Sequence, residues 1–261
     1  MTTLDGILNR RVWLEQPANG FRVAIDTVLL AAAVPAHAGD RILDLGCGVG
    51  GAMLCVACRV PDITGIGIEI QPELVELCRR NLARNGFASG LEVRQSDIAS
   101  FTKNTVIPAN AGIQRSASAR PIAKDDANNF DHALMNPPYH EESRHDASPN
   151  TIKRIANTET TNDLCIWIDA AAAALKQSGT LTLIHRADRQ DEILNLLQNT
   201  FGEIEILPLL PKANTATKRI IIRARKGAAS SVRILPTLVL HKPEGGYTNE
   251  AEAVLRHCKA L

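Results

Sequence analysis

Aromatic side chains, strong net charge and long apolar runs are all scarce in this 261-residue chain. Phe, Trp and Tyr make up 3% of it, and its 29 Lys and Arg nearly balance its 28 Asp and Glu. Without aromatics interleaved among its basic residues, the C-terminal stretch 201–261 is no stacking platform for single-stranded nucleic acid. A net charge of +1 gives no global attraction to nucleic acid or membranes. With no membrane-length apolar run and no signal-peptide pattern, we expect a soluble, cytoplasmic protein.

Clusters of metal-ligating residues are also lacking, although the chain has six cysteines and seven histidines. Cys55 and Cys58 form a C-x-x-C within a predicted helix, and no second pair follows at a zinc-ribbon spacing. The histidines form neither H-E-x-x-H nor H-x-x-E-H. We therefore predict no metal site, and reduced cysteines that pack as small apolar side chains.

The chain does contain an alternation of strand-like and helix-like segments. Strands are predicted at residues 41–45, 63–68, 91–95, 131–135, 181–185, 204–207, 218–224 and 232–235. Helices are predicted at 26–34, 51–59, 72–85, 162–176 and 187–200. Asp26 is a candidate N-cap, and Pro72 suits a first helical turn. This alternation predicts one α/β domain over residues 1–261, built on a mostly parallel, doubly wound sheet.

Two motifs follow predicted strand ends. Residues 46–51 form a glycine-rich turn ahead of a helix, whose N-terminus would offer free N–H groups to a ligand. Residues 136–139, Asn-Pro-Pro-Tyr, end the strand at 131–135. Asn136 offers an amide acceptor, the prolines leave carbonyls without neighbouring donors, and Tyr139 offers a flat face. This combination suits a planar group that carries an amino group.

Acidic residues occupy three further strand ends. Glu69 could accept both hydroxyls of a ribose, and Asp97 could meet an adenine amino group. Asp44 ends the strand that leads into the glycine turn. Because ligands of open α/β sheets bind at the carboxyl ends of the strands, these residues and Asn136 predict one coherent site.

Residues 44–50 resemble motif I of the class I S-adenosylmethionine (SAM)-dependent methyltransferases, and residues 136–139 resemble their amino-methylating motif IV. Segments 16–22, 25–32 and 246–250 resemble the bacterial enzymes that methylate an adenine in the anticodon loop of valine tRNA. The resemblance covers nearly the whole chain outside residues 100–128.

The resemblance implies a Rossmann-like, mostly parallel seven-stranded sheet flanked by helices, with an N-terminal lid at 1–25 and a C-terminal extension at 227–261. SAM would be the cofactor, tRNA the partner and adenine N6 the acceptor. Gln16, Arg22 and Asp26 would close over the cofactor. The implied cofactor-binding residues are Asp44, Gly46, Gly48, Gly50, Glu69, Ile70, Asp97, Ile98, Arg22 and Asp26, and the catalytic residues are Asn136, Pro137, Pro138 and Tyr139.

In this hypothesis the target base is splayed out of the RNA to reach the pocket. The Asn136 side-chain oxygen and the Pro137 carbonyl accept hydrogen bonds from its amino group, and Tyr139 stacks on the ring. No strong general base is needed if the proton leaves after transfer. Catalysis then depends mainly on alignment of the reacting atoms.

Residues 102–128 show no helix or strand period, and Ser, Ala, Asn and Lys dominate them. We interpret this stretch as a loop insertion, either passive or involved in reading the substrate.

Basic residues gather near the C-terminus. Residues 201–261 hold ten Lys and Arg against five Glu. Six of these fall within fifteen residues and could bind phosphates: Lys212, Lys218, Arg219, Arg223, Arg225 and Lys226. Strand parity would place the three arginines on one face. A solvated edge strand that uses charge against aggregation explains them equally well.

Other functions remain open from the sequence. Guanine-N2 methylation of ribosomal RNA, adenine methylation of DNA and glutamine methylation of a protein all fit an amino acceptor. The G-x-G-x-x-G spacing of Gly46, Gly48 and Gly51, together with Glu69, also fits a nicotinamide dehydrogenase. A catalytically inactive RNA-binding protein on the same fold is the non-enzyme alternative.

Overall fold

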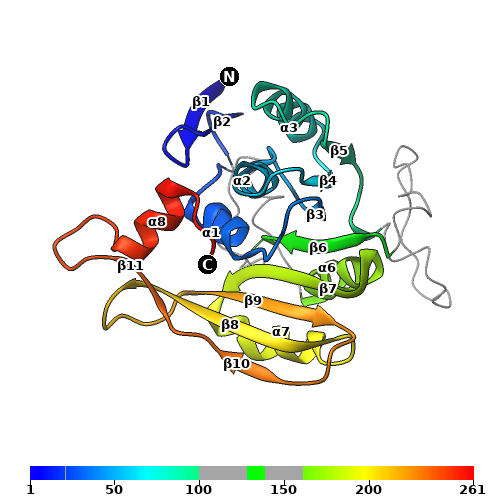
Figure 1. Ribbon diagram of the computed structural model, residues 1–261, viewed down its shortest axis with the longest axis vertical. Helices are drawn as coiled ribbons and strands as arrows, with labels where there is room; N and C mark the ends of the chain where they lie inside the picture. Colours follow the sequence, from blue (N-terminus) through cyan, green and yellow to red (C-terminus); the bar gives the residue numbers. More distant parts are fainter. Residues whose placement is uncertain (21, 100–127, 139–160) are drawn as a thin grey trace, which may run out of the picture.

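A nine-stranded sheet forms the centre of the structure (Figure 1). The computed structural model describes residues 1–20, 22–99, 128–138 and 161–261. Tyr139 and nearly all of the predicted insertion at 102–128 lie outside these ranges. The strands of the sheet are β3 (Arg41–Leu45), β4 (Thr64–Glu69), β5 (Leu91–Gln95), β6 (Phe130–Met135), β7 (Leu175–Arg186), β8 (Phe201–Lys212), β9 (Arg219–Lys226), β10 (Val232–Ile234) and β11 (Leu238–His241).

The strand order confirms a mostly parallel sheet and corrects its size. Seven strands run in the order β8-β9-β7-β6-β3-β4-β5, and β9 alone is antiparallel to its neighbours. The C-terminal extension adds β10 and β11, which both pair parallel with β8. The sheet therefore has two strands more than the seven expected, because the last segment of the chain returns to the outer side of β8.

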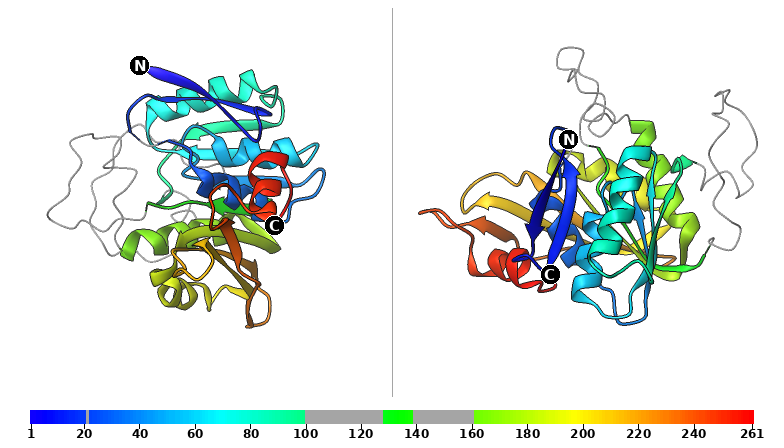
Figure 2. Two further views of the ribbon diagram at one scale, coloured as in Figure 1. Left: turned by 90° about the vertical axis from the view of Figure 1, so that its left-hand side faces the viewer. Right: turned by 90° about the horizontal axis from the view of Figure 1, so that it is seen from above.

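Helices cover both faces of the sheet. They are α1 (Ile25–Ala33), α2 (Gly51–Arg59), α3 (Pro72–Arg84), α6 (Thr161–Ala174), α7 (Gln190–Leu197) and α8 (Asn249–His257). One apolar core joins α1, α2, α3 and α8 to the sheet, and a second joins α6 and α7 to the other face. Figure 2 shows α8 beside α1 on the same side. The central strand β3 is buried from Ile42 to Leu45, because helices cover both faces of the sheet.

Helix boundaries largely follow the predictions, with one error at a cap. α2 has the predicted bounds, and α3 begins with Pro72 in its first turn. Asp26 is not the N-cap of α1: Ala24 holds that position, and no side chain caps the helix. Asp26 instead lies in the first turn, where its negative charge complements the helix dipole.

The predicted lid contains a hairpin of β1 (Thr2–Ile7) and β2 (Val12–Pro17) that lies against α3 (Figure 1). Asn81 of α3 is fully buried and accepts a hydrogen bond from Glu15 N at 2.7 Å. Its amide donates to Glu15 O and to Val49 O, both at 3.0 Å. One amide side chain thus joins the hairpin to the glycine-rich turn that contains Val49.

No helix in the described parts of the chain is long and apolar enough to span a membrane.

Asn81→Ala should lower the free energy of unfolding by about 2–4 kcal/mol, because it leaves buried backbone groups of Glu15 and Val49 without partners. Asn85 makes the same pair of bonds to Trp13 N and O at the exposed end of the hairpin, so it is a matched control. Asn85→Ala should cost about 1 kcal/mol or less, since water replaces its bonds. Urea denaturation of both variants measures the difference, and equal costs would contradict it.

Candidate active site

A tight glycine turn connects β3 to α2 at the carboxyl edge of the sheet. Gly46, Gly48 and Gly50 have φ angles of +67°, +56° and +85°, a region that side chains with a Cβ adopt at a cost. Gly50 N donates to Cys47 O at 2.9 Å, and Cys47 N donates to Ile68 O of β4 at 2.9 Å. The turn is therefore joined to the neighbouring strand before it enters the helix.

The glycines of this turn also make room for the protein's own side chains. A Cβ on Gly46 would lie 2.4 Å from Cη2 of Trp167, and one on Gly50 would lie 2.7 Å from Cys78 Sγ. A Cβ on Gly51 would lie 2.7 Å from Cγ2 of Val23. Close packing of three different elements thus requires glycine here, in addition to any approach of a ligand to the backbone.

Asp44 is buried beneath the turn, with 3% of its surface exposed. Its Oδ2 accepts a hydrogen bond from Met53 N at 3.2 Å, in the first turn of α2. The pKa of Asp44 is raised to about 7, mainly by burial and in smaller part by the nearby Glu69, while the hydrogen bond from Met53 N opposes the rise. This carboxyl group can therefore change its charge near neutral pH.

Glu69 joins the end of β4 to the glycine turn. One of its carboxylate oxygens accepts from Gly48 N at 3.0 Å, and the other accepts from Gln71 N at 2.8 Å. Burial raises the pKa of Glu69, while the bonds from Gln71 and Gly48 oppose that rise. The structure places Glu69 beside Asp44 and the turn, as the strand-end argument predicted.

Three further predicted residues lie at the ends of β4 and β5. Ile70 follows Glu69 with 53% of its surface exposed, which is unusual for a large apolar side chain. Asp97 is exposed, and its Oδ1 accepts from Ala99 N at 3.0 Å. Ile98 packs partly against the core on the α6 side. All three lie near the carboxyl edge, where an apolar surface borders a carboxylate.

Asn136 leaves the sheet next to the glycine turn. Leu45 of β3 pairs with Met135 of β6, so the residues that follow, Gly46 and Asn136, end neighbouring strands at the same level. Asn136 is half-buried, Pro137 is buried and Pro138 is half-buried. The structure thus brings motif I and motif IV together, whereas Tyr139 lies outside the described residues.

The predicted lid residues contact the protein rather than open space. Gln16 Oε1 accepts from Val23 N at 2.8 Å, and its amide donates to Asp5 Oδ2 at 3.1 Å. Arg22 forms an ion pair with Asp5 at 2.7 Å. Asp26 forms one with Arg219 of β9 at 3.3 Å. The segment reaches the site through Val23, which packs against the glycine turn.

The basic strip is used largely within the chain. Arg219, Arg223 and Arg225 share one face of β9, as predicted, but each forms an ion pair, with Asp26, Glu205 and Glu203 respectively. Lys226 Nζ donates to Asn128 Oδ1 and to Leu175 O, at 2.8 and 2.7 Å. The edge-strand alternative is wrong, because β9 lies between β7 and β8. Lys212 and Lys218 remain exposed.

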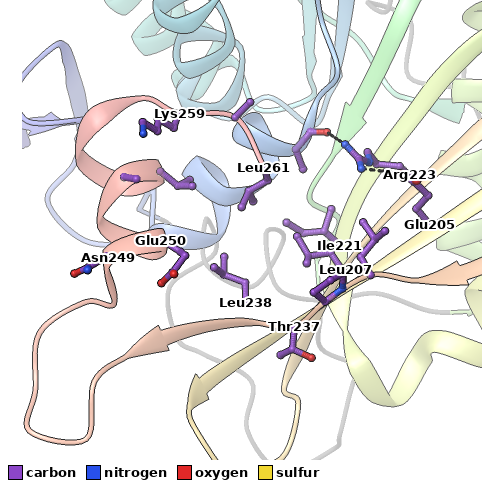
Figure 3. A pocket seen from close by; sticks show the side chains of 16 residues that line it. Glu205, Leu207, Ile221, Arg223, Thr237, Leu238, Asn249, Glu250, Lys259 and Leu261 are labelled. Atoms are coloured by element: carbon purple, nitrogen blue, oxygen red, sulfur yellow. Dashed lines mark hydrogen bonds and ion pairs between the residues drawn. The ribbon is translucent and has the colours of Figure 1, made fainter.

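A groove of about 630 Å³ lies away from this edge, between the C-terminal extension and strands β8 and β9 (Figure 3). Leu207, Ile221 and Arg223 line its floor, and α8 and Leu261 line its walls. Its lining includes none of the predicted catalytic or cofactor-binding residues. The sequence interpretation missed β11 and α8, although Thr248 marks the helix start: its Oγ1 accepts from Ala251 N at 3.2 Å.

Trp167 is a further residue at the site that the sequence interpretation missed. It lies on α6 and contacts Gly46. An aromatic residue on the helix after motif IV was a usable signal, but its distance in the chain from residue 46 concealed the contact.

Within the described ranges, no group of three or more His, Cys, Asp or Glu side chains could hold a metal ion. All six cysteines are free thiols. The predicted C-x-x-C lies on α2, with Cys55 buried and Cys58 partly buried.

A Rossmann-like sheet of this order, with a glycine turn, acidic strand ends and an exposed apolar residue beside them, defines a class I SAM-dependent methyltransferase. Comparison with known proteins agrees, since residues 36–200 match the family described as "Methyltransferase domain". This match spans more than half of the chain, so the protein belongs to that methyltransferase family. SAM is its cofactor, and the nicotinamide dehydrogenase alternative is wrong.

Individual relatives extend the comparison. A tRNA1(Val) (adenine(37)-N6)-methyltransferase of Porphyromonas gingivalis is 28% identical over 92% of this chain and 89% of its own. The crystal structure of a predicted O-methyltransferase from Agrobacterium tumefaciens covers 90% of this chain and 97% of its own, with a TM-score of 0.69 and 26% identity. A SAM-dependent O-methyltransferase from Thermotoga maritima covers 82% of this chain and 69% of its own, with 19% identity and a TM-score of 0.54, and shares the fold.

Gly46→Ala should destabilise the protein by about 2–4 kcal/mol, because it combines a positive φ with a contact to the Trp167 ring. Gly39 is the matched control: its φ is +86°, but a Cβ there meets nothing within 4 Å. Gly39→Ala should cost about 1 kcal/mol.

A double variant tests the contact itself. The free energy of unfolding lost in Gly46→Ala/Trp167→Leu should be smaller than the sum of the losses in the two single variants, by about 1 kcal/mol or more. Thermal and urea unfolding test this, and strict additivity would contradict it.

Proposed function

We propose that this protein transfers a methyl group from SAM to the exocyclic N6 of an adenine in tRNA. The observation that carries the proposal is the position of Asn136 at the end of β6, one strand from the glycine turn. The Asn136 side chain, which can accept hydrogen bonds from an amino group, therefore lies beside the turn that we assign to the cofactor. The Porphyromonas gingivalis relative, with 28% identity over most of both chains, supports adenine N6 and tRNA, because it is a tRNA1(Val) (adenine(37)-N6)-methyltransferase.

The cofactor would lie across the carboxyl ends of β3, β4 and β5. SAM supplies an electrophilic methyl group on a sulfonium. Asp44 and the turn around Gly46 and Gly48 would hold its methionine part, Glu69 its ribose, and Asp97 its adenine amino group. Ile70 and Ile98 would contact the apolar faces of that adenine, and Gly50 would keep the turn close to α2. These residues fit SAM because the turn is narrow and the neighbouring side chains are acidic or apolar.

The acceptor would be held by the protein's own polar groups. Asn136 Oδ1 and the Pro137 carbonyl would accept hydrogen bonds from the base amino group and orient its nitrogen toward the methyl. Pro138 keeps this turn rigid, because its ring restricts φ. Tyr139 would stack on the base. The proton would leave after transfer, so alignment rather than a strong base would supply most of the rate enhancement.

The lid would act through the hairpin as a unit. Gln16 and Arg22 both bind Asp5, and Val23 packs on the glycine turn. If the lid closes over SAM, these residues would therefore move together as one hydrogen-bonded group. Asp26 would contribute from α1, where it now pairs with Arg219. The exposed Lys212 and Lys218 are the residues of the basic strip most available to tRNA phosphates.

A different acceptor is the main alternative. The Agrobacterium tumefaciens structure is titled a predicted O-methyltransferase, which names an oxygen acceptor for that protein. Asn136 and the prolines that follow favour nitrogen here, because an NH₂ group can donate to two acceptors at once. Guanine N2, DNA adenine and protein glutamine also carry NH₂ groups, so the substrate assay must include each of them.

The substrate is tested with methyl-labelled SAM and the purified protein, mixed separately with unmodified tRNA, ribosomal RNA, DNA and cell protein. Label is expected in tRNA and should be recovered as N6-methyladenosine after nucleoside digestion. Asn136→Ala should abolish this turnover and leave SAM binding within about twofold, because Asn136 contacts the acceptor alone. Asn195→Ala, exposed on α7, is the control that should change neither.

Label in another pool would contradict the tRNA assignment and preserve the role of Asn136. Equal loss of SAM binding and turnover in Asn136→Ala would instead contradict the assignment of this residue to the acceptor.

Binding of the cofactor should depend on pH through Asp44. The unliganded protein holds Asp44 with a pKa of about 7, whereas the ionised form pairs better with the cofactor's ammonium group. Below pH 7 binding must expel a proton, so affinity should fall by up to about tenfold per pH unit, and above that pH it should level off. Calorimetric titration with S-adenosylhomocysteine (SAH) at pH 5.5–8.5 measures this. Asp44→Asn should bind weakly with little pH dependence, and an unchanged slope would contradict the assignment.

A further inference from the structure

Trp167 projects from α6 against the glycine turn. Cη2 and Cζ3 of its six-membered ring would lie 2.4 and 2.9 Å from a Cβ placed on Gly46. The ring atoms nearest to the turn are therefore those at the outer end of the six-membered ring. Packing against the turn thus positions a partly buried, electron-rich indole beside the backbone of Gly46.

The apolar core does not fully bury the indole. Trp167 packs against the α6 core only as a partly buried residue. The ring contacts among described residues are His241 with Tyr247 and Arg41 with Phe130, and Trp167 takes part in neither. A large aromatic left partly exposed at the edge of a ligand site is more typical of a binding surface than of a core position.

Trp167 also lies where the two halves of the site meet. Leu45 and Met135 are paired across β3 and β6, so Gly46 and Asn136 leave the sheet side by side. With the cofactor at Gly46 and the acceptor at Asn136, the transferred methyl group lies between these residues. The indole touches Gly46 at this junction.

The carboxylates nearby already bind backbone groups. Asp44 accepts from Met53 N, and both oxygens of Glu69 accept from backbone N–H groups. Asp97 ends β5, two strands from β3, or roughly 10 Å away. A positive charge near Gly46 would find the indole of Trp167 as an electron-rich partner beside these carboxylates, and Trp is the best aromatic residue for cations.

We propose that Trp167 contacts the sulfonium end of bound SAM and makes the protein prefer SAM to SAH. This inference rests on the proposed assignment of the glycine turn to the cofactor and of Asn136 to the acceptor. SAM carries a positive sulfur and SAH a neutral one, so a cation–π contact distinguishes substrate from product. The contact disappears when the methyl group leaves, which favours release of SAH.

The test compares affinities for SAM and SAH, measured by calorimetry on the wild type, Trp167→Phe and Trp167→Leu. Trp167→Leu should weaken SAM roughly three- to thirtyfold and SAH by less than about twofold. Trp167→Phe keeps an aromatic face and should lie between the wild type and Trp167→Leu. Ile234→Ala is the control, because Ile234 is exposed on β10, which pairs with β8 on the side away from the glycine turn, and both affinities should stay unchanged.

A separate Trp13→Phe variant leaves Trp167 as the single indole of the chain and serves only as a fluorescence background. Its fluorescence should then change on addition of SAM, an observation independent of methyl transfer.

Two results would overturn the inference. Equal weakening of SAM and SAH in Trp167→Leu would show that the ring only supports the glycine turn. Unchanged affinities would show that the ring lies outside the cofactor site. Wild-type protein that binds neither ligand would contradict the cofactor assignment itself. Absence of label in tRNA would contradict the proposed substrate and leave the SAM-to-SAH comparison intact.

Discussion

The site depends on two buried carboxyl groups that hold one glycine turn. Asp44 accepts a hydrogen bond from Met53 N in the first turn of α2, and Glu69 accepts hydrogen bonds from Gly48 N and Gln71 N. Burying carboxyl groups is unfavourable unless backbone donors compensate them, and here the turn and the start of α2 provide those donors. The polar groups that stabilise the turn are thus the same ones that we propose to hold the cofactor, which would couple the ionisation of Asp44 to binding.

A second layer of contacts surrounds this turn. Asn81 joins it to the hairpin, Val23 packs on it from the lid, and Trp167 packs on it from α6. Each of these residues comes from a different element, and none is adjacent to the turn in the chain. Side chains from other elements pack so closely on Gly46, Gly50 and Gly51 that none of these positions has room for a Cβ. The lid segment, α3 and α6 therefore meet at a few backbone atoms of this turn.

Much of the fold and of the site edge could be predicted from local pattern. The bounds of α2 and β5 are as predicted, and Asp44, Glu69 and Asn136 do lie at neighbouring strand ends. The predictions were wrong for the N-cap of α1, the edge position of β9 and the number of strands. These errors share a cause: a local sequence pattern shows neither which strand pairs with which nor how the C-terminal extension returns to β8.

The sequence by itself determined the class of chemistry. A glycine turn after an apolar strand, acids at strand ends and an Asn-Pro-Pro-Tyr motif indicate a cofactor site and an amino acceptor, because each depends on residues close in the chain. Only the tertiary structure decided which charges are available and which ring faces the site. It paired the arginines of β9 with carboxylates, buried Asp44 and placed Trp167 on Gly46. Ion pairs, burial and ring packing join residues far apart in the chain, so they exist only once the sheet has assembled.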